Sequence, residues 1–284
     1  MSVLQNIYLF LQKQKIRYEN STAKENLGQH FLTDLNIANA IADTVDACPD
    51  IPILEVGPGM GVLTQYLVQK NRDVKVVEID SESVNYLNEK YPDLRENIIE
   101  DDFLKMDLNT VFNGRKFVLT GNYPYDISSQ IFFKMLDNKD LIPCCTGMIQ
   151  REVAQRMASE PGTKAYGILS VLIQAWYDVE YLFTVDENVF NPPPKVKSAV
   201  IRITRNNVND LGCDWHMFRR VVKAVFNQRR KMLRVSLKQL FDRMPDDSFF
   251  EQDIMTNRPE QLSIQQFVDL TNMVHEQMNR NIDK

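Results

Sequence analysis

Short apolar runs alternate with amphipathic segments along the chain up to about residue 206. The apolar runs predict buried strands at 51–57, 74–80, 97–102 and 116–122, and a strand that passes into a helix at 146–158. Segments with apolar residues every three or four positions predict helices at 33–45, 62–70, 81–91 and 128–137. Thr33 or Asp34 is the expected N-cap of the first of these helices, and Ser81 that of the third. Strands that alternate with such helices are typical of a parallel sheet covered on both faces.

The pattern then changes twice. Residues 179–204 hold two β-rich runs on either side of Pro192–Pro194, which predicts an antiparallel hairpin at the edge of the sheet. Beyond residue 206 the pattern predicts only helices, at 215–241, 245–254 and 263–278. We therefore expect a seven-stranded, mostly parallel, Rossmann-like α/β domain followed by a small all-helical domain.

The composition of the 284 residues, 44% hydrophobic and 25% charged, is that of an ordinary globular protein. No apolar run is long enough to predict a membrane span, and the N-terminal stretch lacks the features of a signal peptide. The cysteines show no metal-binding spacing, and adjacent Cys144 and Cys145 are poorly placed to pair with each other. We therefore expect a cytoplasmic protein with reduced thiols and, because its three histidines are scattered, no metal site.

Charge is distributed unevenly along the chain. The formal net charge is −5, yet residues 215–241 contain no carboxylate and eight basic residues, which are Arg219, Arg220, Lys223, Arg229, Arg230, Lys231, Arg234 and Lys238. Such segregation indicates either one anionic partner met by one face or a solvated helix face.

A glycine-rich turn links the first predicted strand of the sheet to a helix. Gly57, Gly59 and Gly61 allow a tight turn and a close approach of ligand to backbone, and the helix that follows offers free amides. Glu78 ends the next strand, where a carboxylate can accept hydrogen bonds from ribose hydroxyls. This pattern is typical of a site for a dinucleotide or an adenosyl ligand.

Two details favour S-adenosylmethionine over a nicotinamide cofactor. The spacing is G-x-G-x-G rather than G-x-G-x-x-G, and Glu55 before the first glycine suits a ligand that carries an ammonium group. Asp102, after the third strand, could accept a hydrogen bond from the adenine amino group, or it could cap the next segment.

The tetrapeptide Asn122-Tyr123-Pro124-Tyr125 follows the fourth strand, at the edge where ligands bind in parallel sheets. The Asn122 side-chain oxygen and the backbone carbonyl of Tyr123 or Pro124 could each accept one N–H of an exocyclic adenine amine. Pro124 stiffens this geometry, and Tyr125 can stack on the base. Methyl transfer to that amine would then depend on positioning and on the charge of the electrophile, with no strong base required. Alone, the tetrapeptide is more typical of an Asn-Pro turn.

The ordered set of motifs resembles the ribosomal RNA adenine N6-dimethyltransferase family, and in particular its bacterial members that act on small-subunit RNA. The motifs run from Lys24 to about Leu240 and are KENLGQHFL, ILEVGPGMGVLT, VVEID, EDDFL, GNYPYDISS, QREVAQRM, KAYGILSV, VFNPPPKVKSAV and AVFNQRRKML.

The resemblance implies dimethylation of two adjacent adenosines in a hairpin loop near the 3′ end of small-subunit (16S) ribosomal RNA, by a monomer that acts on immature small ribosomal subunits. It implies a catalytic domain at 24–206, a helical RNA-contacting domain at 207–284 and a peripheral extension at 1–23. The implied cofactor contacts are His30, Leu32, Gly57, Glu78, Asp102 and Asn122. The target adenine would meet Asn122, Pro124, Tyr125 and Phe190, and the rest of the RNA would meet Lys164, Tyr166, Arg229, Arg230 and Lys231. Some cations of the basic segment should instead face acids of the main domain.

The sequence departs from the family pattern at two site positions. His30 stands where the family often has Asn, so the hydrogen bond to the cofactor would depend on pH. Tyr123 replaces a smaller aliphatic residue, and its side chain is expected to pack away from the base.

Three other functions stay open at this stage. A DNA adenine N6-methyltransferase would usually begin the tetrapeptide with Asp and add a sequence-reading domain. A non-catalytic assembly factor would bind immature subunits through the basic segment. A nicotinamide dehydrogenase is disfavoured by the glycine spacing.

Overall fold

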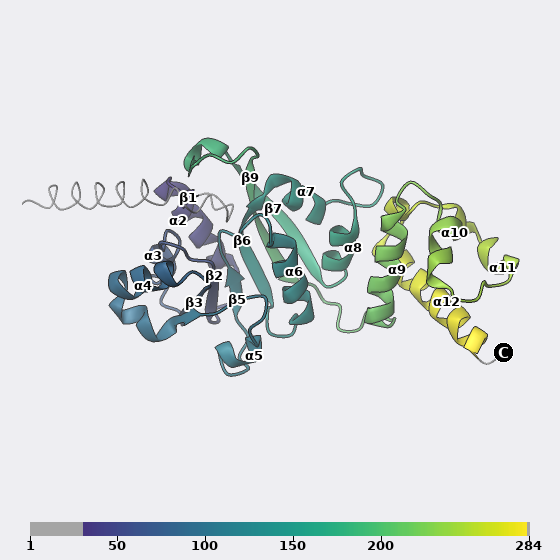
Figure 1. Ribbon diagram of the computed structural model, residues 1–284, viewed down its shortest axis with the longest axis horizontal. Coiled ribbons are helices and arrows are strands. Elements are labelled where there is room, and N and C mark those ends of the chain that lie inside the picture. Colours follow the sequence, from purple (N-terminus) through teal and green to yellow (C-terminus); the bar gives the residue numbers. More distant parts are fainter. Residues whose placement is uncertain (1–30, 283–284) are drawn as a thin grey trace, which may run out of the picture.

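The computed structural model describes residues 31–282 and is built around a seven-stranded sheet (Figure 1). The strand order is β4-β3-β2-β5-β6-β9-β7, in which the first five strands are parallel and β9 runs antiparallel to both of its neighbours, β6 and β7. The strands are β2 (Ile53–Val56), β3 (Val74–Glu78), β4 (Ile98–Glu100), β5 (Val118–Thr120), β6 (Cys144–Gln150), β7 (Tyr177–Val185) and β9 (Ser198–Arg205). The seven strands and the antiparallel edge are those predicted from the sequence.

Helices cover both faces of the sheet. Successive residues of a strand point to opposite sides, and here apolar side chains on both sides are buried. Ile53, Val118 and Cys144 belong to the core on the side of α2 (Leu35–Asp43) and α3 (Thr64–Leu67). Their neighbours Leu54, Leu119 and Cys145 belong to the core on the other side, which α6 (Ser128–Asp137), α7 (Arg151–Met157) and α8 (Ile168–Gln174) cover. The remaining helices of this part are α4 (Ser81–Lys90) and α5 (Leu108–Val111).

Two helix details differ from the sequence prediction. The helix expected at 62–70 is only the four-residue α3, because the glycine turn continues to residue 63. The N-cap of α4 is Asp80, whose carboxylate accepts the backbone N–H of Ser83 at 3.1 Å, and not Ser81. Asp34 caps α2 as predicted.

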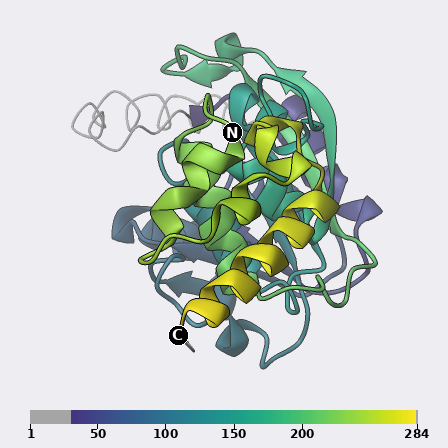
Figure 2. The same cartoon turned by 90° about the vertical axis from the view of Figure 1, so that its right-hand side faces the viewer.

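The C-terminal helices pack together at one end of the molecule (Figures 1 and 2). They are α9 (Trp215–Asn227), α10 (Leu233–Ser236), α11 (Asp247–Phe250) and α12 (Ile264–Ile282). The predicted helix over 215–241 is wrong, because α9 ends at Asn227 and the basic Arg229, Arg230 and Lys231 lie in the turn that follows. Phe226 of α9 stacks on Phe267 of α12, at 5.9 Å between ring centroids.

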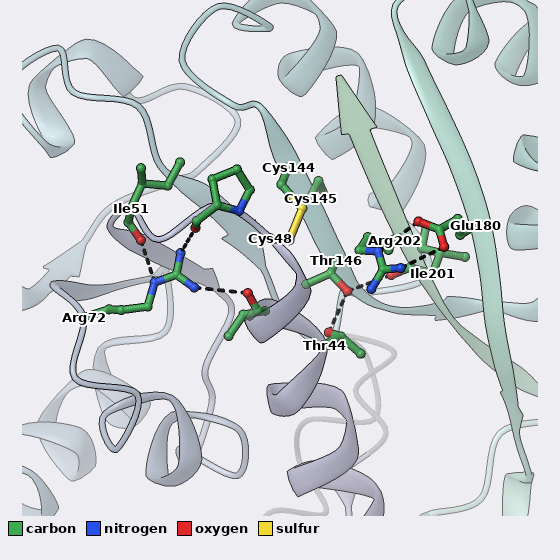
Figure 3. The surroundings of a disulfide bond; sticks show 12 residues. Thr44, Cys48, Ile51, Arg72, Cys144, Cys145, Thr146, Glu180, Ile201 and Arg202 are labelled. Carbon is green, nitrogen blue, oxygen red and sulfur yellow. Dashed lines mark hydrogen bonds and ion pairs between the residues drawn. A yellow bond between two sulfur atoms is a disulfide. The ribbon is translucent and has the colours of Figure 1, made fainter. Parts of the chain in front are cut away.

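A disulfide between Cys48 and Cys144 connects the segment after α2 to the start of β6 (Figure 3). The expectation of four reduced thiols is therefore wrong for this pair. Alternation along β6 explains why Cys144 and not Cys145 is used, since Cys144 faces α2 and the buried Cys145 faces the other way. The second contact that joins this segment to β6 is a hydrogen bond of 2.6 Å between the hydroxyl groups of Thr44 and Thr146.

A second, two-stranded sheet was not predicted from the sequence. β1 (Phe31–Leu32) pairs antiparallel with β8 (Phe190–Asn191), so that Leu32 lies opposite Phe190. The pairing joins residues about 160 positions apart and places both short strands beside the carboxyl ends of the parallel strands. No helix within residues 31–282 has the length and apolar character that a membrane span requires.

Candidate active site

A cavity opens at the carboxyl edge of the sheet, between the glycine turn, the end of β3 and the Asn122–Tyr125 loop. Its walls bring together most of the residues predicted for cofactor and target base, namely Leu32, Gly57, Glu78, Asp102, Asn122, Pro124, Tyr125 and Phe190. His30 lies outside the described residues. The cavity thus joins the predicted cofactor residues and the predicted base-binding residues in one continuous space.

The glycine turn owes its shape to backbone conformations that other residues rarely adopt. Gly57 and Gly59 have φ of 66° and 53°, and the space where a side chain would stand is open toward the cavity wall. The N–H of Gly57 donates to the Val77 carbonyl at 2.9 Å, which ties the turn to β3. The turn therefore exposes backbone to a ligand, as expected for a cofactor cradle.

Glu78 is hydrogen-bonded to the glycine turn. Its buried carboxylate accepts backbone N–H groups from Gly59 at 3.0 Å, Ile79 at 2.8 Å and Asp80 at 3.0 Å. A carboxylate has about four acceptor positions, so at least one remains for a ribose hydroxyl. Glu78 thus shapes the glycine turn and lines the cavity at the same time.

Glu55, close before the turn, is a buried acid whose pKa is strongly raised. It is 1% exposed, and burial raises the pKa of its carboxyl group to about 8, while a 2.7 Å hydrogen bond from the Thr64 hydroxyl opposes the rise. The negative charge of Glu78 raises the pKa further. A cation that enters the cavity would favour the ionised form, so the pair of acids fits a ligand with an ammonium group.

We expect the Glu55→Gln variant to be more stable than the parent protein at pH 8 and equally stable at pH 4.5. The folded protein holds the Glu55 proton up to about pH 8, whereas an unfolded chain releases it near 4.5, so the free energy of unfolding falls as pH rises between these values. Thermal unfolding across this range should show a gain in Tm of about 5 °C at the upper end. Glu89→Gln, on the exposed side of α4, is the matched control, and a gain independent of pH would contradict the assignment.

The first two residues of the Asn122–Tyr125 loop are bonded to β6. Asn122 forms a parallel bridge with Met148, and the Tyr123 N–H donates to the Met148 carbonyl at 3.0 Å. The Tyr123 ring is buried, and its hydroxyl donates to the Thr146 carbonyl at 2.9 Å. The Tyr123 side chain therefore packs away from the base site, as predicted, and anchors the loop.

The Asn122 and Pro124 groups that should hold an amine remain accessible. The Asn122 side chain makes no hydrogen bond to another described residue, and both residues are half-buried in the cavity wall. Tyr125 lies beside them, with burial raising the pKa of its hydroxyl. The loop thus offers one side-chain oxygen, backbone carbonyls and one aromatic ring to the same space.

Asp102 and Phe190 line the cavity and also have structural contacts. Asp102 lines the cavity, but it also caps the next turn by accepting the Leu104 N–H at 2.9 Å, and its ion pair with Lys105 lowers the pKa of its carboxyl group. Phe190 lines the cavity and is 4% exposed within the core on the α2 side.

The predicted RNA contacts lie away from the cavity. Tyr166 is fully buried and packs edge-on against Phe226, at 6.2 Å between centroids, so its expected place on a substrate channel is wrong. Lys164 is exposed in a separate open groove between α7 and β7. Arg229 donates to the Thr163 carbonyl at 3.1 Å, whereas Arg230 and Lys231 are exposed.

Three residues in or beside the cavity were not predicted from the sequence. Phe31 and Phe103 line the cavity, and Ser198, at the start of β9, contacts Tyr125. An acidic motif precedes Phe103 and could have suggested it. Phe31 and Ser198 reach the site only through tertiary pairing, for which a single sequence carries no signal.

Solved structures with this topology identify the class of protein. A dimethyladenosine transferase from Plasmodium falciparum has a TM-score of 0.69 over 88% of this chain and 98% of its own, and at 24% identity it shows the shared fold. The 23S rRNA methyltransferase ErmE has a TM-score of 0.60 over 86% of this chain and 99% of its own, with 27% identity. Together with the cavity, they define an S-adenosylmethionine-dependent methyltransferase.

Sequence relatives define the family. Residues 20–276 match the sequence model of the ribosomal RNA adenine dimethylases, and the chain belongs to that family. It is 65% identical to a ribosomal RNA small subunit methyltransferase A of Phocaeicola vulgatus, over 92% of each chain. A protein of the same name from Bacteroides fragilis is 68% identical over 89% of this chain and 92% of its own. The protein is therefore an RNA-modifying methyltransferase, which excludes a nicotinamide dehydrogenase and a purely non-catalytic factor.

Proposed function

We propose that this enzyme dimethylates N6 of two adjacent adenosines in a hairpin loop near the 3′ end of small-subunit ribosomal RNA. The observation that carries the proposal is the single cavity in which the Glu55 and Glu78 acids meet the Asn122–Tyr125 loop. The relatives named small subunit methyltransferase A support the choice of small-subunit RNA.

Within this proposal the chain binds and orients both partners. Bound S-adenosylmethionine supplies a sulfonium methyl group as electrophile. Glu55 and Glu78 receive the ammonium and ribose groups, while Leu32, Gly57 and Asp102 border the rest of the cofactor. Asn122 and the Pro124 segment accept the two N–H groups of the amine, and Tyr125 and Phe190 flank the base. Localising the nitrogen lone pair in this way supplies rate through orientation.

The direct test is mass spectrometry of unmethylated small-subunit RNA after treatment with the enzyme and S-adenosylmethionine. We expect dimethyladenosine at two adjacent positions of one hairpin loop near the 3′ end. Modification of large-subunit RNA alone would overturn the choice of substrate.

The proposed setting is the cytoplasm, with a monomer acting on immature small subunits. Residues 24–206 form the proposed catalytic domain, and 207–284 the domain that holds the RNA. The exposed Lys164, Arg230 and Lys231 are the proposed phosphate contacts. Arg219 is not available for this role, because it pairs with Asp137 of α6 at 2.7 Å.

We expect the double substitution Arg230→Ala and Lys231→Ala to weaken RNA binding at low salt and to flatten its salt dependence. Each lost phosphate contact should reduce the slope of log K against log salt by about 0.7–0.9. Filter binding at several salt concentrations measures both effects. Arg219→Ala on the same segment is the control, and an unchanged slope in the double variant would remove these residues from the interface.

A further inference from the structure

Two serine hydroxyls contact Tyr125, one at the hydroxyl of its ring and one at its backbone carbonyl. The Ser198 hydroxyl and the Tyr125 hydroxyl lie 2.5 Å apart and share a hydrogen bond. At the other end, the Ser128 hydroxyl donates to the Tyr125 backbone carbonyl at 3.2 Å. Ser198, 73 residues away in the sequence, is thus a hydrogen-bond partner of the ring hydroxyl in the cavity wall.

Ser198 is a rigid point of attachment. It is fully buried and is the first residue of β9, which pairs on one side with Gln150 of β6 and on the other with Val185 of β7. The two ladders fix the Ser198 backbone, so the point from which its hydroxyl reaches Tyr125 does not shift. The Tyr125 side chain, by contrast, rises from a loop of non-helical residues between β5 and α6.

We propose that Ser198 is a positioning residue for methyl transfer, which fixes the Tyr125 ring in the orientation that receives the target adenine. This inference rests on the proposed function, in which Tyr125 stacks on the base. A hydrogen bond at the ring hydroxyl favours the one χ1 rotamer that places the hydroxyl beside Ser198. Ser198 itself is not among the residues that line the cavity.

A purely structural hydrogen bond would have different consequences. It would affect the free energy of unfolding and leave the chemical step alone. A positioning role predicts a loss in the rate of transfer at saturating RNA, with unchanged affinity for the cofactor. It also predicts that Ser198 and Tyr125 act as one unit, so that removing both hydroxyls costs no more than removing one.

The experiment is a double-mutant cycle of Ser198→Ala and Tyr125→Phe, measured by single-turnover methylation of unmethylated small ribosomal subunits. We expect each single variant, and the double variant, to transfer methyl groups about tenfold more slowly than the parent enzyme. Calorimetry should give an S-adenosylmethionine Kd within about twofold of the parent value. Ser236→Ala, a buried serine in α10, is the matched control and should keep the parent rate.

Three outcomes would overturn the proposal: a parent-like rate in Ser198→Ala, additive losses in the double variant, or losses accompanied by weaker cofactor binding. If Ser198→Ala fails to fold, Tyr125→Phe carries the test, because it keeps the ring and Ser198, and a parent-like rate in that variant overturns the proposal. Tyr125→Ala separates the two levels of inference. Full activity in Tyr125→Ala would refute the stacking role itself, whereas its inactivity beside a parent-like Ser198→Ala would refute only the positioning role.

Discussion

The Asn122→Ala variant should fold normally and show no measurable methyl transfer. In the proposed mechanism its carboxamide accepts an N–H of the target amine, and it makes no hydrogen bond to another described residue that its loss would break. Loss of one oriented polar group at a reacting centre typically costs about 10²–10³ in rate, and here that group also directs the nitrogen lone pair. Incorporation of labelled methyl groups into small-subunit RNA measures the effect.

The control for this variant is Asn88→Ala, because within residues 31–282 the Asn88 side chain bonds only to the Val84 carbonyl of its own helix, at 3.0 Å. Binding of Asn122→Ala to immature subunits separates chemistry from assembly: an inactive variant that still binds would show that the two roles can be divided. Full activity would contradict the role given to Asn122.

Gly147→Ala should cost both stability and activity, by about 3 kcal/mol in the free energy of unfolding. Gly147 has φ of 141°, and a Cβ there would stand 2.3 Å from the Gly121 carbonyl oxygen and 2.8 Å from the Tyr123 ring. The carbonyl cannot yield cheaply, because it accepts the Met148 N–H at 3.0 Å. Relief of the clash would displace the strand end that carries Asn122. Denaturant unfolding and methylation assays on the folded fraction measure the two effects.

Gly162→Ala is the matched control, since Gly162 also has a positive φ, of 86°, but a Cβ there would meet nothing within 4 Å. Its cost should be limited to about 1 kcal/mol of backbone strain, with full activity. Equal losses in both variants would show that backbone conformation, and not the close approach of Gly147 to Gly121, explains the effect.

Local patterns predicted the parallel part of the fold well. β2 and β5 are short apolar runs with both faces buried, and such runs stand out from the amphipathic helices between them. The glycine turn, Glu78 and the Asn122–Tyr125 loop could be placed at one edge because parallel strands end together. The end of α9 was missed because Arg229, Arg230 and Lys231 are good helix formers, and only packing against Thr163 shows that the chain turns there.

Pairings between distant segments could not be predicted in the same way. The Cys48–Cys144 bond depends on which of the two adjacent cysteines of β6 faces Cys48, and this follows only once the register of the sheet is known. Tyr166 looked like a loop residue beside a glycine, yet it packs against a helix about 60 residues later in the chain. Burial of this kind is a tertiary property, and local composition carries no information about it.

The short ladder between β1 and β8 has a consequence for the order of events at the site. Leu32 is a predicted contact of the cofactor and Phe190 a predicted contact of the base, and the two are direct partners across two strands of two residues each. A ligand that orders one of the two strands also orders its partner strand. The second ligand then loses less conformational entropy on binding, so the two ligands should bind with positive cooperativity. By thermodynamic reciprocity, RNA should then tighten the hold on S-adenosylmethionine by the same factor as the cofactor tightens the hold on RNA.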